Sequence, residues 1–244
     1  MRPCVLFLFN SSTYAVDPWI AKGVHCVSVD YTDTDHSAAR DRQRSTQDHT
    51  RISLDLSQSG ARATLQAQLR ARGLDPRLVV SFAPCTDLAV SGAAHFARKR
   101  QRDPLFQQKA LWLAQLASFF GVPYAVENPV SVLSTLWRKP DLIFDPWEFS
   151  DYCPTGDHPE APELYPECDR YNKKTCLWTG NGFCLPVKRG EPPEGEQRNP
   201  GHRALGGKSA RTKHLRSLTP RGFAKAVMCA NIHHVTGQRP EESW

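Results

Sequence analysis

The sequence predicts a single α/β domain with a Rossmann-like sheet and a small irregular insertion. Three observations predict this fold: short apolar runs typical of buried strands, helix-like segments between them, and polar or reactive residues directly after the runs. A chain of 244 residues is long enough to bury a substantial core as one domain. The carboxyl ends of the predicted strands are therefore where we expect the chemistry.

The N-terminal part has the order of a nucleotide-binding half-fold. Residues 4–9 are expected to form the first buried strand, 16–22 a helix, and 24–29 a second strand that leads into Asp30. Such folds hold ribose hydroxyls with an acidic residue at this position, so Asp30 is a candidate cofactor contact. The alternative is an ordinary solvated aspartate at the end of a strand.

Three further segments complete the predicted core. A third strand-like run, residues 51–56, puts Asp55 at a candidate position for contact with an adenine ring. Apolar residues at near-helical spacing between 105 and 120 predict a helix that packs on the sheet. The Thr-Pro pair at Thr219 is expected to cap a last helix that runs to Asn231.

A Pro-Cys pair, Pro84-Cys85, follows the apolar run of residues 78–80. The carboxyl end of a parallel strand is where open α/β sheets place their reactive groups, so Cys85 is a candidate nucleophile. The alternative is a small buried apolar side chain, which is the commoner role of a single cysteine.

A second strand-like run, residues 123–126, leads into Glu127-Asn128-Pro129. Glu127 stands 42 positions after Cys85, and a thiol and a carboxylate at the ends of two strands can face one substrate. Alone, Glu-Asn-Pro is an ordinary strand-to-turn signal. The order and spacing of the two motifs together favour a shared catalytic site more strongly than either motif does alone.

In these two motifs the chain resembles the DNA cytosine-5 methyltransferase family, which has a Pro-Cys nucleophile loop and a Glu-Asn loop at about this separation. The resemblance implies a class I methyltransferase fold, S-adenosyl-L-methionine as cofactor and DNA as substrate. It assigns Cys85 as the nucleophile and Glu127 as the partner of ring nitrogen 3, with Pro84 and Asn128 shaping the two loops. The short chain is similar to compact phage or prophage members.

The chemistry explains why these residue types belong together. A thiolate adds to carbon 6 of cytosine while an acid protonates ring nitrogen 3, and the addition makes carbon 5 nucleophilic toward an activated methyl group. Cysteine suits the first role, and a glutamate with a raised pKa suits the second. The base has to be flipped out of the duplex to reach Cys85. RNA is disfavoured, because RNA-directed relatives carry the attacking cysteine in the loop that here is Glu127-Asn128-Pro129.

The expected cofactor loop departs from the family pattern. Methyltransferases usually carry a glycine-rich loop after the first strand, whereas this chain has Phe9, Asn10 and Ser11 followed by Ser-Thr. Asn and Ser can form tight turns and offer hydrogen bonds, so these three residues are the expected contacts to S-adenosyl-L-methionine. Two alternatives stay open: a different sulfonium donor, or a DNA-binding protein that has lost its cofactor.

Basic residues supply the candidate DNA contacts. Arg98 and Arg100 belong to a cluster close to the nucleophile loop, and Lys173 and Lys174 lie in the irregular region. Contact with phosphates is the functional interpretation, and a solvated charged face is the alternative. The net charge of +6, from 31 Lys and Arg against 25 Asp and Glu, leans only mildly toward a polyanionic partner.

The expected organisation is a catalytic core at 1–129, an irregular target-recognition insertion at 130–215 and a C-terminal return to the core at 216–244. The insertion contains five conceivable zinc ligands, and Cys153 and Cys168 are the two retained as candidates, but it contains no Cys-x-x-Cys pair, so no metal is predicted. The five are Cys153, His158, Cys168, Cys176 and Cys184.

Localisation and partners follow from composition. The sequence has no apolar stretch near the ~20 residues of a membrane span and no usual signal peptide, and its eight cysteines are far below disulfide-scaffold density. We therefore expect a cytoplasmic protein of a bacterium or phage-infected host, with free thiols, no membrane partner and no obligate protein partner.

Overall fold

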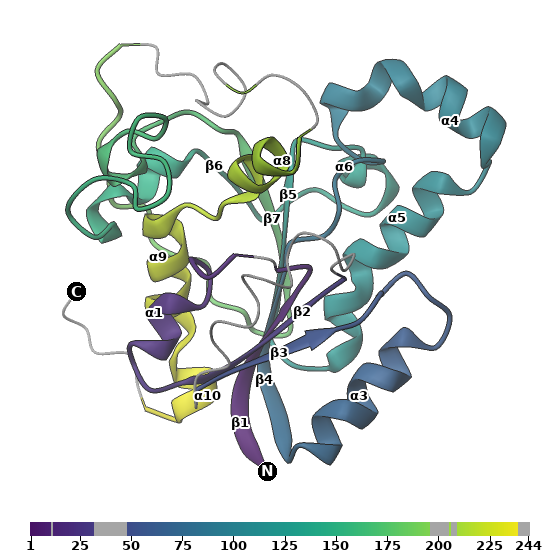
Figure 1. The fold of residues 1–244 in the computed structure, drawn as a ribbon, viewed down its shortest axis with the longest axis horizontal. Helices are drawn as coiled ribbons and strands as arrows, with labels where there is room; N and C mark the ends of the chain where they lie inside the picture. The colour runs from purple at the N-terminus through teal and green to yellow at the C-terminus, as the bar shows by residue number, and fades with distance from the viewer. Residues whose placement is uncertain (11, 32–47, 196–204, 206–208, 239–244) are drawn as a thin grey trace.

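A computed structural model of the protein describes residues 1–10, 12–31, 48–195, 205 and 209–238. It is an α/β structure around one seven-stranded mixed sheet, as Figure 1 shows. The strand order is β3-β2-β1-β4-β5-β7-β6. The strands are β1 (Arg2–Leu8), β2 (His25–Asp30), β3 (His49–Ser53), β4 (Leu74–Ser81), β5 (Tyr124–Pro129), β6 (Leu142–Phe144) and β7 (Thr175–Gly180). The α/β class is thus confirmed, and the sheet is compatible with a Rossmann-like fold.

The strands from β1 to β5 are parallel, and β7 runs antiparallel to both of its neighbours, β5 and β6. Both β6 and β7 come from the region 130–215, which the sequence analysis treats as an irregular insertion. Part of that region therefore completes the sheet. β7 joins the sheet because Cys176, Leu177 and Trp178 are almost fully buried there. The sequence does not predict this strand because its buried run is too short to show a strand period.

Helices cover both faces of the sheet (Figure 1). The α-helices are α1 (Asp17–Ile20), α3 (Ala61–Ala71), α4 (Phe96–Arg102), α5 (Phe106–Gln115), α6 (Leu133–Leu136), α8 (Ala210–Ser217), α9 (Arg221–Asn231) and α10 (His233–Thr236). Short 3-10 helices are η1 (Val90–His95), η2 (Leu116–Phe120), η3 (Pro146–Tyr152) and η4 (Glu167–Asp169). Residues of α3 and α5 share one core cluster with the sheet, and residues of α1 and α9 share the other. The helix expected between 105 and 120 is confirmed as α5 continued by η2.

The start of α9 differs from the expected Thr219 cap. The N-cap residue is Pro220, and no side chain of the cap residue accepts a hydrogen bond from the first turn. Instead, the backbone nitrogen of Arg221 donates to Oδ2 of Asp169 at 2.5 Å. A carboxylate 52 positions away in the chain thus satisfies a helix-terminal donor, which local sequence rules do not reveal.

All eight cysteines are free thiols, as expected. In the described ranges, every helix is too short or too polar to cross a bilayer.

Candidate functional site

The order of the strands marks one topological switch point at the carboxyl edge of the sheet. The chain adds β2 and β3 on one side of β1, and then β4 and β5 on the other. The order reverses between β1 and β4, and open α/β sheets bind ligands at such a switch point. The loop after β1 and the loop after β4, which carries Cys85, leave the sheet there.

The Cys85 loop has a defined conformation. The carbonyl oxygen of Cys85 accepts hydrogen bonds from the backbone nitrogens of Leu88 and Ala89, at 3.0 and 2.8 Å. Lys99 in α4 binds the loop from outside: its Nζ donates to the Thr86 carbonyl at 2.9 Å and lies 2.6 Å from Oδ1 of Asp87. Cys85 itself is half-buried. The expected nucleophile is therefore held in place, and Lys99, seen in the sequence only as part of a charge cluster, is one of the residues that hold it.

Asn128 connects the Glu127 loop to the Cys85 loop. Its side chain is fully buried, and its Nδ2 donates to the Ala83 carbonyl at 2.8 Å. Backbone hydrogen bonds add to this contact, from Val90 to the Val130 carbonyl at 3.1 Å and from Val132 to the Leu88 carbonyl at 2.9 Å. The two motifs, 42 positions apart in the sequence, form one bonded unit, in which Asn128 is a positioning residue.

Charge couples Cys85, Glu127 and Lys173. Burial raises the pKa of the Glu127 carboxyl, and the nearby Lys173 ammonium lowers that pKa in part. Burial also raises the pKa of the Cys85 thiol, the Glu127 carboxylate raises it further, and Lys173 lowers it. The structure therefore brings the predicted nucleophile and the predicted acid into electrostatic contact, together with one of the predicted DNA-contacting lysines.

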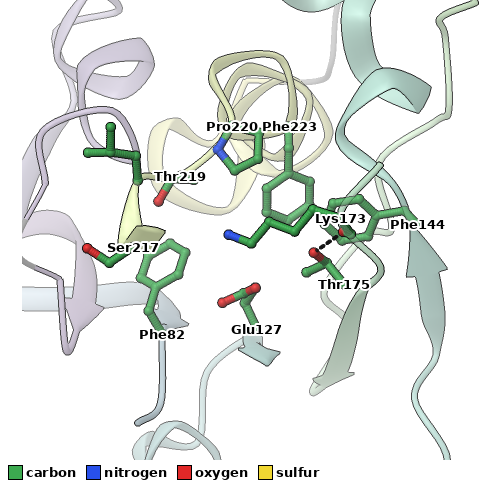
Figure 2. A pocket seen from close by; sticks show the side chains of 10 residues that line it. Phe82, Glu127, Phe144, Lys173, Thr175, Ser217, Thr219, Pro220 and Phe223 are labelled. Atoms are coloured by element: carbon green, nitrogen blue, oxygen red, sulfur yellow. Dashed lines mark hydrogen bonds between the residues drawn. The ribbon is translucent and has the colours of Figure 1, made fainter. Parts of the chain in front are cut away.

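Glu127 and Lys173 line a pocket beside this unit. Figure 2 shows the ammonium group of Lys173 and the carboxylate of Glu127 pointing into the same space, with aromatic rings around them. Lys173 also donates to the Arg216 carbonyl at 3.4 Å. The pocket is lined by Phe82, Glu127, Phe144, Lys173, Thr175, Ser217, Leu218, Thr219, Pro220 and Phe223. Most of these residues were not predicted, because they come from separate segments that only the fold brings together.

The loop after β1 is positioned partly as expected. Phe9 follows β1 with a φ of 56°, a left-handed conformation uncommon for a residue other than glycine. Asn10 is buried, and its Nδ2 donates to Oγ of Ser28 in β2 at 3.1 Å. This amide nitrogen is therefore directed toward the sheet, because a buried amide needs a partner. Ser11 lies outside the described residues.

The two aspartates predicted for the cofactor have different surroundings. Asp30 ends β2 at the carboxyl edge of the sheet, and its Oδ1 accepts from the backbone nitrogen of Tyr31 at 2.9 Å. Asp55 follows β3 and accepts hydrogen bonds from both the nitrogen and the hydroxyl of Ser57 and from Gln58. These bonds lower the pKa of Asp55 and place its carboxylate in a local turn.

The basic residues predicted to bind DNA are spread over two places. Arg98 and Arg100 are exposed on α4, the helix whose Lys99 contacts the Cys85 loop. Lys174 is exposed, with its Nζ 3.5 Å from Oδ2 of Asp145. Lys173 alone faces the pocket.

Cys153 and Cys168 are the two candidate zinc ligands retained from the sequence. Cys153 is buried, and its Sγ donates to Oδ2 of Asp169 at 3.7 Å. Neither Cys153 nor Cys168 belongs to a group of three or more ligating side chains within the described ranges. Spacing alone could not decide this, since it does not show which way the thiols point.

No protein-family model matches this chain, and no curated protein matches it either.

Proposed function

We propose that the protein is a DNA cytosine-5 methyltransferase that acts through a covalent adduct at Cys85. The observation that carries the proposal is the bonded unit of two loops, in which Cys85 and Glu127 interact electrostatically at the carboxyl edge of the sheet. The Pro84-Cys85 and Glu127-Asn128 motifs supply the identity of the reaction by resemblance. The mixed seven-stranded sheet is compatible with the class I methyltransferase fold.

The proposed reaction begins with the Cys85 thiolate, which forms a bond from Sγ to carbon 6 of cytosine. The electron pair of the carbon 5–carbon 6 double bond shifts to the carbon 4–carbon 5 bond, the pair of the carbon 4–nitrogen 3 double bond shifts to nitrogen 3, and nitrogen 3 takes the proton of Glu127. Carbon 5 would then form a bond to the methyl group supplied by the sulfonium donor, whose sulfur would keep the electron pair of the broken carbon–sulfur bond and leave as a thioether. Loss of the carbon 5 proton to solvent and departure of Cys85 restore the aromatic ring, and the proton on nitrogen 3 returns to Glu127.

The direction of the pKa shift suits the proposed role of Glu127 and opposes the proposed role of Cys85. Burial raises the pKa of Glu127, which favours the protonated form that a general acid needs. Burial also raises the pKa of Cys85, which opposes the thiolate. Protonation of Glu127 removes the negative charge that disfavours the Cys85 thiolate, and the Lys173 ammonium favours that thiolate. The pair is therefore best suited to react as thiolate and carboxylic acid together.

The lining of the pocket suits a flat ring with polar edges, because it combines one carboxylate with several aromatic side chains. Glu127 provides a polar group at one wall, and Phe82, Phe144 and Phe223 provide apolar walls. A single nucleobase flipped out of a DNA duplex is a ligand of this kind.

The proposal places the nucleoside part of S-adenosyl-L-methionine at the switch point between β1 and β4. Asp30 ends β2 on this edge, at the position where Rossmann-like folds bind ribose hydroxyls. When bound, this cofactor supplies the electrophilic methyl group. Asp30 would hold its ribose, and the loop after β1 would face its amino-acid end.

The remaining parts of the proposal concern DNA and the cell. Arg98, Arg100 and Lys174 would contact phosphates, and the region 130–215 would recognise the target sequence. A cytoplasmic setting in a bacterium or a phage-infected host supplies both DNA and S-adenosyl-L-methionine.

One observation favours a second candidate, a cytosine carbon-5 modification with a different sulfonium donor. The loop after β1 contains no glycine, Phe9 carries a positive φ, and Asn10 bonds to Ser28. A backbone with these side chains approaches the amino-acid end of a donor less closely than a glycine-rich loop does. A catalytically inactive DNA-binding homologue is the third outcome that the experiment distinguishes.

Mass spectrometry of nucleosides tests the proposal. DNA is incubated with the wild-type protein and S-adenosyl-L-methionine, and in parallel is isolated from cells that express the protein. We expect 5-methylcytosine in both samples and none with Cys85→Ala. A heavier cytosine adduct found only in the cellular DNA supports the second candidate, and unmodified cytosine in both samples contradicts catalysis.

A further inference from the structure

Three side chains that commonly bind metals meet outside the proposed catalytic site. They are Cys184, in the segment after β7, and His233 and His234 at the start of α10. One ligand atom from each, the Cys184 sulfur and one ring nitrogen of each histidine, lie within 4.8 Å of one another. The sequence analysis considered Cys184 only together with other residues of the insertion and did not connect it with these histidines, which are 49 and 50 positions away.

This cluster lies at the opposite edge of the sheet from Cys85. Because β7 is antiparallel to β5, its last residue Gly180 pairs with Tyr124, the first residue of β5. Cys184 follows four residues later, whereas Cys85 follows the carboxyl end of β4. Figure 1 accordingly shows α10 near the N-terminus of β1, far from α8 at the other end of the sheet.

A tight turn directs Cys184 toward α10. The Phe183 nitrogen donates to the Gly180 carbonyl at 3.2 Å, and the two residues between them, Asn181 and Gly182, have φ values of 54° and 85°. Two consecutive positive φ values at Asn-Gly are typical of a type I′ turn. The turn leaves the Cys184 side chain exposed.

Asn231 fixes the backbone of Cys184. Its Oδ1 accepts from the Cys184 nitrogen at 2.9 Å, and its Nδ2 donates to the Cys184 carbonyl at 2.8 Å. Asn231 is fully buried at the end of α9, two residues before His233. One buried amide thus holds the cysteine beside the two histidines, which is the kind of support that orients metal ligands.

The two histidines carry polar atoms without partners. Within the described part of the chain, Nδ1 of His233 and Nε2 of His234 are buried and make no hydrogen bond. The two rings lie close together, with centroids 4.0 Å apart. Buried ring nitrogens normally have partners, so these two nitrogens are available for a bond to a metal ion.

We propose that Cys184, His233 and His234 bind one Zn²⁺ ion, with a water molecule as the fourth ligand. A thiolate and two imidazoles form a donor set that zinc accepts, and zinc imposes little geometric preference of its own. Zinc–ligand distances of about 2.0–2.3 Å place tetrahedral ligand atoms about 3.3–3.8 Å apart. The present separations are up to 4.8 Å, so the side chains have to move closer together when the ion binds. The bound ion joins the end of β7 to α10, and Cys184 releases its proton on binding.

Zinc titration of the full-length protein, freed of metal with a chelator, tests this site. Calorimetry is expected to show one Zn²⁺ per chain, and a rise in melting temperature as zinc is added. Cys184→Ser and His234→Gln are each expected to weaken zinc binding by at least roughly 10–100-fold, the loss that even a supporting residue of a metal site produces. Cobalt(II) in place of zinc gives a thiolate-to-metal absorption band that Cys184→Ser is expected to remove.

Two matched controls make the test specific to this thiol. Cys168→Ser changes another cysteine that is not fully buried, and Cys85→Ala removes the proposed nucleophile; both are expected to bind zinc as the wild type does. Absence of stoichiometric zinc binding by the wild type overturns the proposal. Unchanged zinc affinity and an unchanged cobalt band in Cys184→Ser overturn it as well.

Discussion

Glu127→Gln is expected to change two reactions of Cys85 in opposite directions. Glutamine keeps the shape and a hydrogen bond but cannot deliver the proton to nitrogen 3, so methyl transfer should fall by roughly 10²–10⁴, the usual contribution of general acid catalysis. That fall corresponds to roughly 2.7–5.5 kcal/mol of transition-state stabilisation. The Cys85 thiol, in contrast, should become a stronger nucleophile toward a simple alkylating agent.

The second effect follows from the charges around the thiol. The pKa of Cys85 is raised by burial and then by the negative charge of the Glu127 carboxylate. Loss of that carboxylate lowers the pKa of Cys85, so more thiolate is present at a given pH and alkylation by iodoacetamide is faster. Peptide mass spectrometry follows the alkylation of Cys85 across a pH series.

Glu163→Gln is the matched control, since it removes the same charge from an exposed carboxylate. It should leave both reactions unchanged. Wild-type methyl transfer in Glu127→Gln would limit Glu127 to a structural role. An unchanged alkylation profile would show that the carboxylate does not act on the thiol.

Three further changes test the surroundings of the site. Lys173→Met removes the charge that lowers the pKa of Cys85, so the alkylation profile should shift to higher pH, whereas Lys174→Met should leave it in place; equal shifts would contradict the assignment. Asn128→Ala breaks the buried bond between the two loops and should lower the free energy of unfolding in urea by about 1–3 kcal/mol; an unchanged midpoint would argue against this link. Asp30→Ala should weaken S-adenosylhomocysteine binding in calorimetry by roughly 1–3 kcal/mol, and a wild type that gives no heat at millimolar ligand would favour the non-catalytic alternative.

The strands that the sequence predicts well are those with long buried runs. The runs that became β1 and β2 are continuous enough to indicate two buried faces, and the structure confirms both within about two residues. The helix α3 was not predicted, because only Ala61, Leu65 and Leu69 of its residues are buried. β6 has three residues, too few for any periodic signal.

The part of the candidate site that lies in local sequence motifs could be predicted. Cys85 and Glu127 follow strands, and parallel strands bring their carboxyl ends to one edge. Lys99 and the pocket residues of the segment before α9 were not predictable, because their roles depend on contacts between distant parts of the chain. The direction of Asn10 toward Ser28 was equally hidden, since a sequence does not show which side of a loop is buried.

Covalent trapping on DNA that contains 5-fluorocytosine tests the central claim most directly. Fluorine at carbon 5 cannot leave as a proton does, so the bond between Sγ and carbon 6 should persist after methyl transfer. With S-adenosyl-L-methionine present, we predict a stable protein–DNA complex whose cross-linked peptide carries the nucleotide on Cys85. Cys85→Ala should form no complex. A cross-link at another residue, or one that Cys85→Ala retains, would contradict the assignment of Cys85 as the nucleophile.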